Sequence, residues 1–497
     1  MPSVMTMNLG FLTRCSAVVS LVVLFLAATA ASAQVPLTQI STDTFTNTTS
    51  QHATEVEPAS FTVGSTTVSI FQMGRFTDGG ASDIGFSTST NGGVTWTQGN
   101  LPGITKLEGT GIYDRASDAS VTYNLKFKVW LAEVLALSER NGPHGAAVLV
   151  SSSTDGITWS NPATVSVASS SGFYDKPWIG CDNHATSPHY GNCYVEWDDF
   201  SQFDLIKMST STDGGKTWSP KKSTAGSASG NGGIPLVQPN GTVIVPIDDP
   251  FLSSVLAFKS TDGGTTWTAP VTVAFISEHG VAGGMRALPL INAAMDVKGK
   301  VYVVWADCSF RTNCTSNDIV MSTSTDGTTW TPVVRIPIDP VSGKVDHFTP
   351  GLGLKQGTSG TTARLGLTYN FFPNASCTSN CNLSVGFIAS ANGGTTWNAA
   401  KTLANGMNPN WLPSTTSGQM VGDYMTATFT KTGVHGVFSD AKAPVGSTLK
   451  EGTFTNTGGL ADAEDGPQFS SANDRPVPNA HSDHPKRTTP YVDNGRD

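Results

Sequence analysis

The chain has 497 residues and a formal net charge of −9, and only 13% of its residues are charged. That share is about half of the roughly 25% found in typical globular domains, and 52 glycines accompany many Ser and Thr residues. This composition is typical of a turn-rich all-β protein. The acidic balance, with no basic cluster to oppose it, argues against nucleic acid as a partner.

The first 33 residues have the pattern of a secretory signal peptide. Arg14 supplies the positive charge, residues 16–30 are almost wholly apolar, and Ala31-Ser32-Ala33 is a small-residue cleavage site. A membrane anchor would need about 20 apolar residues with no cleavage site behind them. We therefore expect export without a membrane anchor, to the periplasm or the extracellular space, with the mature chain starting near Gln34.

Six short segments share one pattern. Each starts with Ser, has Asp or Asn two residues later, continues with one or two Gly residues, and ends in Thr-Trp. They are residues 89–96 (STNGGVTW), 153–159 (STDGITW), 211–218 (STDGGKTW), 260–267 (STDGGTTW), 324–330 (STDGTTW) and 390–397 (SANGGTTW). The Asp or Asn oxygen can accept N–H bonds from its own loop, and Gly supplies positive φ without steric cost. The Trp can bury a large apolar face at the base of the turn.

These segments resemble the Asp boxes of the sialidase superfamily, and with the surrounding strands the resemblance covers roughly residues 36–458. In that family the boxes are structural turns on the blades of a β-propeller, on the face away from the active site. The resemblance therefore implies an all-β, sialidase-like propeller over residues 34–458, with the functional residues on the face opposite the boxes.

Between the boxes the strand pattern repeats about every 60 residues, the length of a four-stranded unit. Inner strands are expected to start near residues 58, 117, 176, 233, 286, 347 and 421, which favours seven blades and leaves six open. The last unit has no box and lacks a fourth strand, and Pro36–Ser41 resembles the strands that follow the boxes. We expect residues 36–41 to complete that last blade and so remove an exposed edge. Residues 459–497 are polar without an apolar period, which predicts a disordered tail.

Six cysteines remain after the signal peptide, as three pairs that lie close together in the sequence. We predict local disulfides between Cys181 and Cys193, Cys308 and Cys314, and Cys377 and Cys381, formed in an oxidising compartment. A zinc site is the competing interpretation, but two of the pairs have no His at ligand spacing.

Strand direction alternates within a blade, so the face opposite the boxes is built from second–third strand turns and blade-to-blade connections. Charged and aromatic residues concentrate in these segments: Glu55, Glu57, Arg75, Asp78, Arg115, Asp118, Asp175, Lys176, Asp198, Asp199, Asp248, Asp249, Arg286, Asp423 and Tyr424. In a chain so poor in charge, this concentration predicts a polar pocket for a sugar or an acidic ligand. An Asp at such a position can also cap a turn or pair with a neighbouring Arg or Lys.

A sialidase requires three arginines that hold the substrate carboxylate, an Asp acid/base, and a Tyr nucleophile activated by Glu. The resemblance assigns the arginine role to Arg75, Arg115 and Arg286, because the planar guanidinium binds carboxylates in a bidentate manner. It assigns the acid/base to Asp118 or Asp78. Tyr424 becomes the nucleophile, an exception to the two-carboxylate rule of glycosidases, and Glu57 its partner.

Two main functions follow from these residues, and a lyase with Tyr424 or His347 as base is a third option that no feature singles out. The first is a secreted, sialidase-like glycoside hydrolase that acts on terminal, anionic or neutral sugars of glycans. The second is a non-catalytic propeller that binds surface glycans or proteins, since the Phe/Tyr-Arg-Ile-Pro signature of sialidases is missing and its nearest match is Gly74-Arg75-Phe76. We expect a carbohydrate partner, a monomer and no cofactor. A structural calcium ion stays open, because carboxylates such as Asp198 and Asp199 suit its preference for oxygen ligands.

Overall fold

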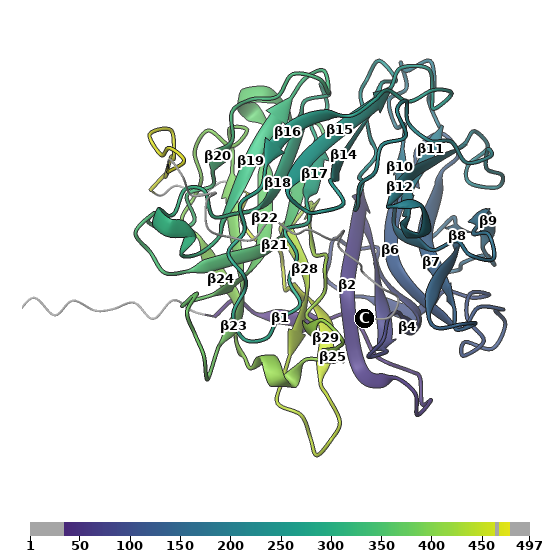
Figure 1. Ribbon diagram of the computed structural model, residues 1–497, viewed down its shortest axis with the longest axis horizontal. Helices are drawn as coiled ribbons and strands as arrows, with labels where there is room; N and C mark the ends of the chain where they lie inside the picture. The colour runs from purple at the N-terminus through teal and green to yellow at the C-terminus, as the bar shows by residue number, and fades with distance from the viewer. Residues whose placement is uncertain (1–33, 463–466, 478–497) are drawn as a thin grey trace, which may run out of the picture. The chain divides into compact units, whose positions relative to one another are not determined.

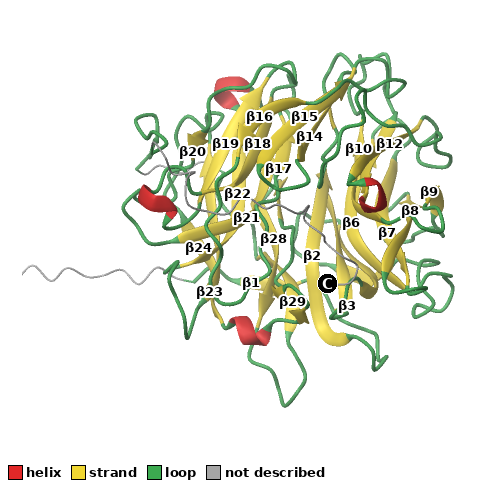
Figure 2. Cartoon of the chain, viewed as in Figure 1, coloured by secondary structure: helices red, strands yellow, loops and turns green. Residues whose placement is uncertain are grey.

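The computed structural model describes residues 34–462 and 467–477, so the signal peptide expected in residues 1–33 lies outside the described residues. The described protein is all-β, and its sheets do not close into a barrel. Its helical segments are four single 3₁₀ turns, shown in Figure 2: η1 (Phe200–Gln202), η2 (Thr312–Cys314), η3 (Gly360–Thr362) and η4 (Pro409–Trp411).

The strands follow one another as antiparallel runs in chain order (Figure 1). The first run is β2 (Gln51–Val63), β3 (Thr66–Arg75), β4 (Ala81–Ser89) and β5 (Thr97–Asn100); the second is β6 (Arg115–Asn124), β7 (Val129–Ser138), β8 (His144–Ser153) and β9 (Ala163–Val167). The third is β10 (Tyr174–Cys181), β11 (Cys193–Asp199) and β12 (Leu205–Ser211). Single residue pairs, Ala81 with Ala116 and Gly145 with Tyr174, join these runs to each other.

Three further runs each form a separate four-stranded sheet. They are β13 (Leu236–Val237), β14 (Val243–Asp248), β15 (Ser254–Ser260) and β16 (Val271–Phe275); β17 (Asn292–Met295), β18 (Val301–Asp307), β19 (Asp318–Ser324) and β20 (Val334–Arg335); and β21 (Asp346–Leu354), β22 (Leu365–Phe372), β23 (Leu383–Ser390) and β24 (Lys401–Met407). A short hairpin, β25 (Ser414–Thr415) and β26 (Gly418–Gln419), precedes the last run of β27 (Thr426–Thr430), β28 (Gly433–Ala441) and β29 (Glu451–Asn456).

The N-terminal segment completes the last run, as the sequence predicts. Strand β1 (Leu37–Gln39) pairs antiparallel with β29, with Leu37 opposite Asn456 and Gln39 opposite Phe454 (Figure 1). Ile40 follows it and is fully buried. Residues from the two ends of the chain therefore share one sheet, and β29 has no exposed edge along this stretch.

The first strand of every run faces one cavity of about 430 Å³. Its wall includes residues of β2, β6, β10, β13, β17, β21 and β27, the strands that were expected to be the inner ones. Apolar side chains fill the space between neighbouring sheets, and the largest that are fully buried include Trp197, Trp305 and Trp397. Each sheet therefore buries its faces against its neighbours in the chain.

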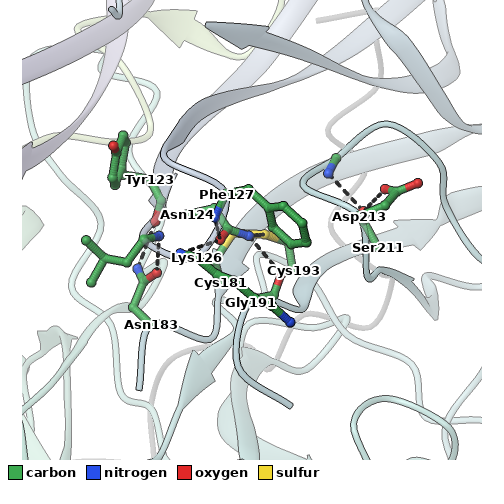
Figure 3. The surroundings of a disulfide bond; sticks show 12 residues. Tyr123, Asn124, Lys126, Phe127, Cys181, Asn183, Gly191, Cys193, Ser211 and Asp213 are labelled. Atoms are coloured by element: carbon green, nitrogen blue, oxygen red, sulfur yellow. Dashed lines mark hydrogen bonds between the residues drawn. A yellow bond between two sulfur atoms is a disulfide. The ribbon is translucent and has the colours of Figure 1, made fainter. Parts of the chain in front are cut away.

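The six box segments form the turns predicted for them. In every one, the first Ser hydroxyl hydrogen-bonds the Asp or Asn side-chain oxygen two residues later. In the third box, Asp213 Oδ1 also accepts the N–H groups of Lys216 (3.1 Å) and Thr217 (3.0 Å). A Cβ on Gly214 would lie 2.9 Å from Phe127, in the turn between β6 and β7. The boxes therefore lie at the same end of the sheets as the first–second strand turns (Figure 3).

The three predicted disulfides are present. Cys181 bonds Cys193 across the paired ends of β10 and β11, as Figure 3 shows. Cys308 bonds Cys314 around η2, and Cys377 bonds Cys381 in the turn between β22 and β23. All six cysteines in the described part of the chain are used in these bonds, so these six form no zinc site.

The expected disorder of the tail does not hold for its described part, residues 459–462 and 467–477. Leu460 pairs with Val434 of β28, and Phe469 pairs with Trp397 of the last box. The reason is that backbone hydrogen bonds and single apolar contacts hold this segment, neither of which produces an apolar period in the sequence. Residues 463–466 and 478–497 lie outside the described residues.

We predict that replacing residues 36–41 by an equally long Gly-Ser segment lowers the melting temperature. The change removes the buried Ile40 side chain, worth about 2–5 kcal/mol when truncated, and exposes the edge of β29. Thermal unfolding followed by circular dichroism measures the effect. An unchanged melting temperature would show that the N-terminal strand contributes nothing to the last sheet.

We predict that Asp213→Ala lowers the free energy of unfolding by about 1–3 kcal/mol, because the N–H groups of the turn lose their acceptor. Asp213→Asn is the matched control and should cost less, since Asn stands at this position in two other boxes. Denaturant titration measures both variants. Any activity per folded molecule should be unchanged, and its loss in folded Asp213→Ala would place the boxes at the functional end.

Candidate functional site

Three neighbouring strands carry the same irregularity. Glu57 in β2, Asp118 in β6 and Lys176 in β10 have positive φ angles of 56°, 41° and 47°. Each lies where the strand pairing shifts by one residue. Such bulges re-aim a side chain, and positive φ is strained for residues other than glycine. The bulges thus bring a Glu, an Asp and a Lys toward each other, and strain of this kind clusters at functional sites.

Lys176 is at the centre of the resulting cluster. Its Nζ lies 2.8 Å from Oδ2 of Asp423 and 3.3 Å from Oδ1 of Asp118. Arg286 binds the same Asp423 carboxylate through two nitrogens, with Nη2 2.9 Å from Oδ2 and Nε 3.3 Å from Oδ1. Burial by itself would raise the pKa of Asp423, but Arg286 and Lys176 outweigh it and hold that pKa below its usual range.

Tyr424 joins the cluster through its hydroxyl, which donates to Oδ1 of Asp118 at 2.8 Å. Its ring packs edge-on against Trp178, with ring centroids 5.4 Å apart. Burial and the neighbouring Asp118 raise the pKa of the phenol, whereas Lys176 opposes that rise. Asp118 is therefore the group placed to receive the Tyr424 proton.

Glu57 occupies a different environment in the same cluster. Its carboxyl oxygens accept hydrogen bonds from the Gln72 amide and from the backbone N–H of Asp423, the latter at 3.2 Å. Burial, with the negative charges of Asp118 and Asp423, raises the pKa of Glu57 to about 8. At neutral pH Glu57 is therefore mostly protonated and can donate a proton.

A small pocket opens beside these groups. Its wall includes Glu57, Arg75, Asp118, Asp175 and Arg286, and its enclosed volume is about 20 Å³. Arg75 reaches it from the end of β3, and its Nη1 donates to the carbonyl of Gly80 at 2.7 Å. Two guanidinium groups and the Glu57 and Asp118 carboxyl groups thus meet at one space.

The structure brings together most of the residues that were assigned from the resemblance. Glu57, Asp118, Arg286 and Tyr424 belong to the cluster, and Arg75 shares the pocket with the first three. The expected partner of Tyr424 is corrected, because its hydroxyl bonds Asp118, whereas Glu57 bonds Gln72 and the Asp423 N–H.

Arg115 lies elsewhere. Its guanidinium bonds Asp78 (2.6 Å) and Glu139 (2.8 Å) and stacks on Phe76, with 3.9 Å from its Cζ to the ring centroid. Asp78, the other residue considered for the acid, is thereby a partner of Arg115. The pocket is lined by two of the three predicted arginines.

The sequence placed Lys176, Asp175 and Asp423 on this face but assigned them no role. The signal that the sequence offers for Lys176 is its place beside Pro177 in a short segment with an aromatic residue at each end (YDKPW). For Gln72 we find no signal, since it lies within a regular strand and becomes relevant only by packing beside Glu57.

The carboxylates considered for calcium have other partners or surroundings. Asp199 accepts from the Ser201 hydroxyl at 2.6 Å and from the Gln202 amide, and Asp198 is buried opposite Asp175. Among the described residues, the group with ligand atoms close enough for one ion is Asp318, Asp339 and His347. Its two carboxylates are bound by Arg311 and Arg335, which already balance their charge.

No helix among the described residues has both the length and the apolar character needed to cross a membrane. No known protein-family profile matches the chain, and no curated protein sequence matches it.

Solved structures to which the chain is similar include a polysaccharide lyase named as an ulvan lyase, with 11% identity, a TM-score of 0.49 and coverage of 85% of this chain and 97% of that one. The NanB sialidase from Streptococcus pneumoniae has 14% identity, a TM-score of 0.40 and coverage of 85% and 70%. An α-L-arabinanase from Penicillium chrysogenum has 17% identity, a TM-score of 0.37 and coverage of 60% and 80%.

We predict that the raised pKa of Glu57 makes stability depend on pH. Between the unfolded value near 4.5 and about 8, the folded state holds a proton that the unfolded state has lost. The free energy of unfolding therefore falls as pH rises through this window. Glu57→Gln removes this contribution, so the variant should lose about 1–4 kcal/mol less than the wild type between pH 5 and pH 8. Denaturant titrations at both pH values test this, and equal losses would contradict it.

Proposed function

We propose that the protein is an exported, monomeric β-propeller of seven blades that hydrolyses glycosidic bonds in glycans carrying anionic sugars. The seven strands that line one cavity and the N-terminal strand that completes the last run support this architecture. Three local disulfides support an oxidising compartment outside the cytoplasm. The six box turns resemble the Asp boxes of the sialidase superfamily, and this resemblance also supports a β-propeller.

One observation carries the catalytic part of the proposal, the contact between the Tyr424 hydroxyl and Asp118 Oδ1 at 2.8 Å. A nucleophile within hydrogen-bond reach of a base is the arrangement required for covalent catalysis. Lys176 lies 3.3 Å from the same Asp118 oxygen and its Nζ is 5.2 Å from the centre of the Tyr424 ring. Its positive charge stabilises the phenolate that forms when Tyr424 gives up its proton.

The hydrolysis runs in two steps. In the first, the Tyr424 oxygen forms a bond to the anomeric carbon while the glycosidic bond breaks. Asp118 takes the phenol proton, and Glu57 gives its proton to the departing oxygen. In the second, water attacks the anomeric carbon, Glu57 takes a proton from that water, and the bond to Tyr424 breaks as Asp118 returns its proton. The environments of the two carboxyl groups suit these roles, because Glu57 is protonated near neutral pH and Asp118 accepts hydrogen bonds.

Arg75 and Arg286 give the site its preference for an anionic sugar. Both line the pocket, and guanidinium groups recognise carboxylates by shape as well as charge. The enclosed space of about 20 Å³ is too small for a whole sugar ring. The sugar carboxylate would therefore enter the pocket while the ring remains at its mouth.

Binding without turnover is the second candidate. The observation that favours it is the degree of burial, because Tyr424 is only 9% exposed and Asp118 only 5%. A site of this kind could hold the charged group of a glycan and perform no chemistry. The two functions differ in the effect of removing the Tyr424 hydroxyl. A hydrolase would lose turnover, whereas a binding protein would show no measurable change.

We predict that Tyr424→Phe lowers kcat by about 100-fold or more and leaves KM nearly unchanged, since the hydroxyl acts in the transition state. Release of a fluorophore from an α-linked sialoside, a β-glucuronide and a panel of neutral glycosides measures turnover. Arg286→Lys should instead raise KM for the anionic substrates, by about tenfold or more.

Tyr302→Phe is the matched control, a buried tyrosine of β18 that lies beside Gly393 of the last box. It should keep wild-type kinetics. Turnover on neutral sugars alone would discard the anionic substrate and keep the hydrolase. Glycan binding with no turnover on any substrate would establish the binding function instead.

A further inference from the structure

Four phenylalanines form two ring pairs that the turn η1 joins, one of them at the pocket; we call Phe173, Phe200, Phe203 and Phe251 the aromatic row. Phe173 lines the pocket together with Asp118 and Arg286. Its ring centroid lies 5.4 Å from that of Phe200, and those of Phe203 and Phe251 are 5.9 Å apart. Phe200 begins the single turn η1 and Phe203 follows it, and the N–H of Phe203 donates to the Phe200 carbonyl at 3.0 Å.

The position of Phe203 in this turn is energetically unfavourable in two ways. Its side chain is 50% exposed, although burial of a phenylalanine is strongly favourable. Its φ is 61° and that of the following Asp204 is 51°, a left-handed conformation that is unusual for a bulky residue. A loop that holds an exposed ring in a strained conformation suggests a binding role.

Hydrogen bonds hold both loops that carry the row. Asp199 accepts from the Ser201 hydroxyl and from the N–H of Phe173, the latter at 3.4 Å. In the other loop, Asp249 accepts from the N–H groups of Ser253 (2.6 Å) and Ser254 (3.1 Å). The rings are therefore presented by preorganised turns, which lowers the entropy lost when a ligand binds.

The loop of Phe251 also reaches the candidate site. The next residue, Leu252, is 4% exposed and packs in one apolar cluster with Leu288, Leu290 and Tyr424. The aromatic row is thus connected to the site at two places, through Phe173 in the pocket wall and through Leu252 beside Tyr424. A ligand that occupies the pocket would extend naturally over these rings.

We propose that the aromatic row is a set of sugar-binding subsites and that the ligand is a glycan of several residues. This rests on the proposed function of the pocket: the anionic terminal sugar meets Arg75 and Arg286, and the following sugars lie on Phe203 and Phe251. The C–H faces of sugar rings pack on aromatic rings. The four phenyl rings carry no charge, so they do not compete with the pocket for the anionic sugar. A protein partner fits less well, because a stable protein interface requires about 1,000 Å² or more with good complementarity.

The experiment measures affinity as a function of glycan length. The probes are α2,8-linked oligosialic acids and oligogalacturonates of one to six residues, titrated calorimetrically into the full-length protein. Wild-type affinity should rise with length in at least one series. The double variant Phe203→Ala/Phe251→Ala should bind the hexamer about tenfold more weakly, a difference of about 1.4 kcal/mol. Its affinity for the monomer should change less than twofold.

The matched control is Phe127→Ala, a phenylalanine 40% exposed at the box end of β6 and β7, beside Gly214 (Figure 3). It should leave the length dependence intact. Phe203→Trp should also preserve it, because the larger ring still offers an aromatic face.

The outcomes separate the two proposals. Length-dependent binding that is lost in the double variant, without hydrolysis of any probe, supports the row and overturns the hydrolase. Hydrolysis with a length dependence equal in wild type and double variant supports the hydrolase and overturns the row. Absence of binding by every probe, or affinity independent of length in the wild type, also overturns the row.

Discussion

The structure depends most strongly on the pairing of the buried ammonium group of Lys176. Its side chain is 1% exposed, and the paired carboxylates of Asp118 and Asp423 are 6% and 1% exposed. A buried charge costs several kcal/mol unless it is well paired. The partners come from β6 and from the segment before β27, and Arg286 from the segment before β17 completes the set. Four distant parts of the chain must therefore reach their places together, so that the candidate site also holds the sheets in position.

The bulge that brings these groups together is a repeated feature whose chemistry depends on one residue. Glu57, Asp118 and Lys176 lie at corresponding shifts of register in β2, β6 and β10, and Thr349 in β21 has the same positive φ, 46°. The strand repeat provides the backbone irregularity in each case. The side chain at that position decides whether a run contributes an acid, a base, a cation or a neutral hydroxyl to the centre.

The two ends of the sheets are held by different kinds of interaction. At the box end, each turn is closed by its own residues, within six positions of the Ser that starts it. At the other end, contacts join residues far apart in the sequence, such as Tyr424 and Asp118, which are 306 positions apart. Local turns can tolerate change one at a time, whereas the loss of one charge at the other end leaves its partner buried and unsatisfied.

The sequence by itself determined the features that depend on neighbouring residues. The six turns, the three disulfides and the strand at residues 37–39 follow from spacing and residue type, because each involves a short segment or a recurring pattern. The sequence also placed Glu57, Arg75, Asp118, Arg286 and Tyr424 on one face, since strand alternation decides at which end a residue lies. Only the tertiary structure decided the partners. Tyr424 bonds Asp118 while Glu57 bonds Gln72, Arg115 pairs with Asp78 and Glu139, and Lys176 becomes central. These pairings depend on how sheets that are hundreds of residues apart in the sequence pack around a common centre. No local sequence pattern encodes which of these residues come into contact.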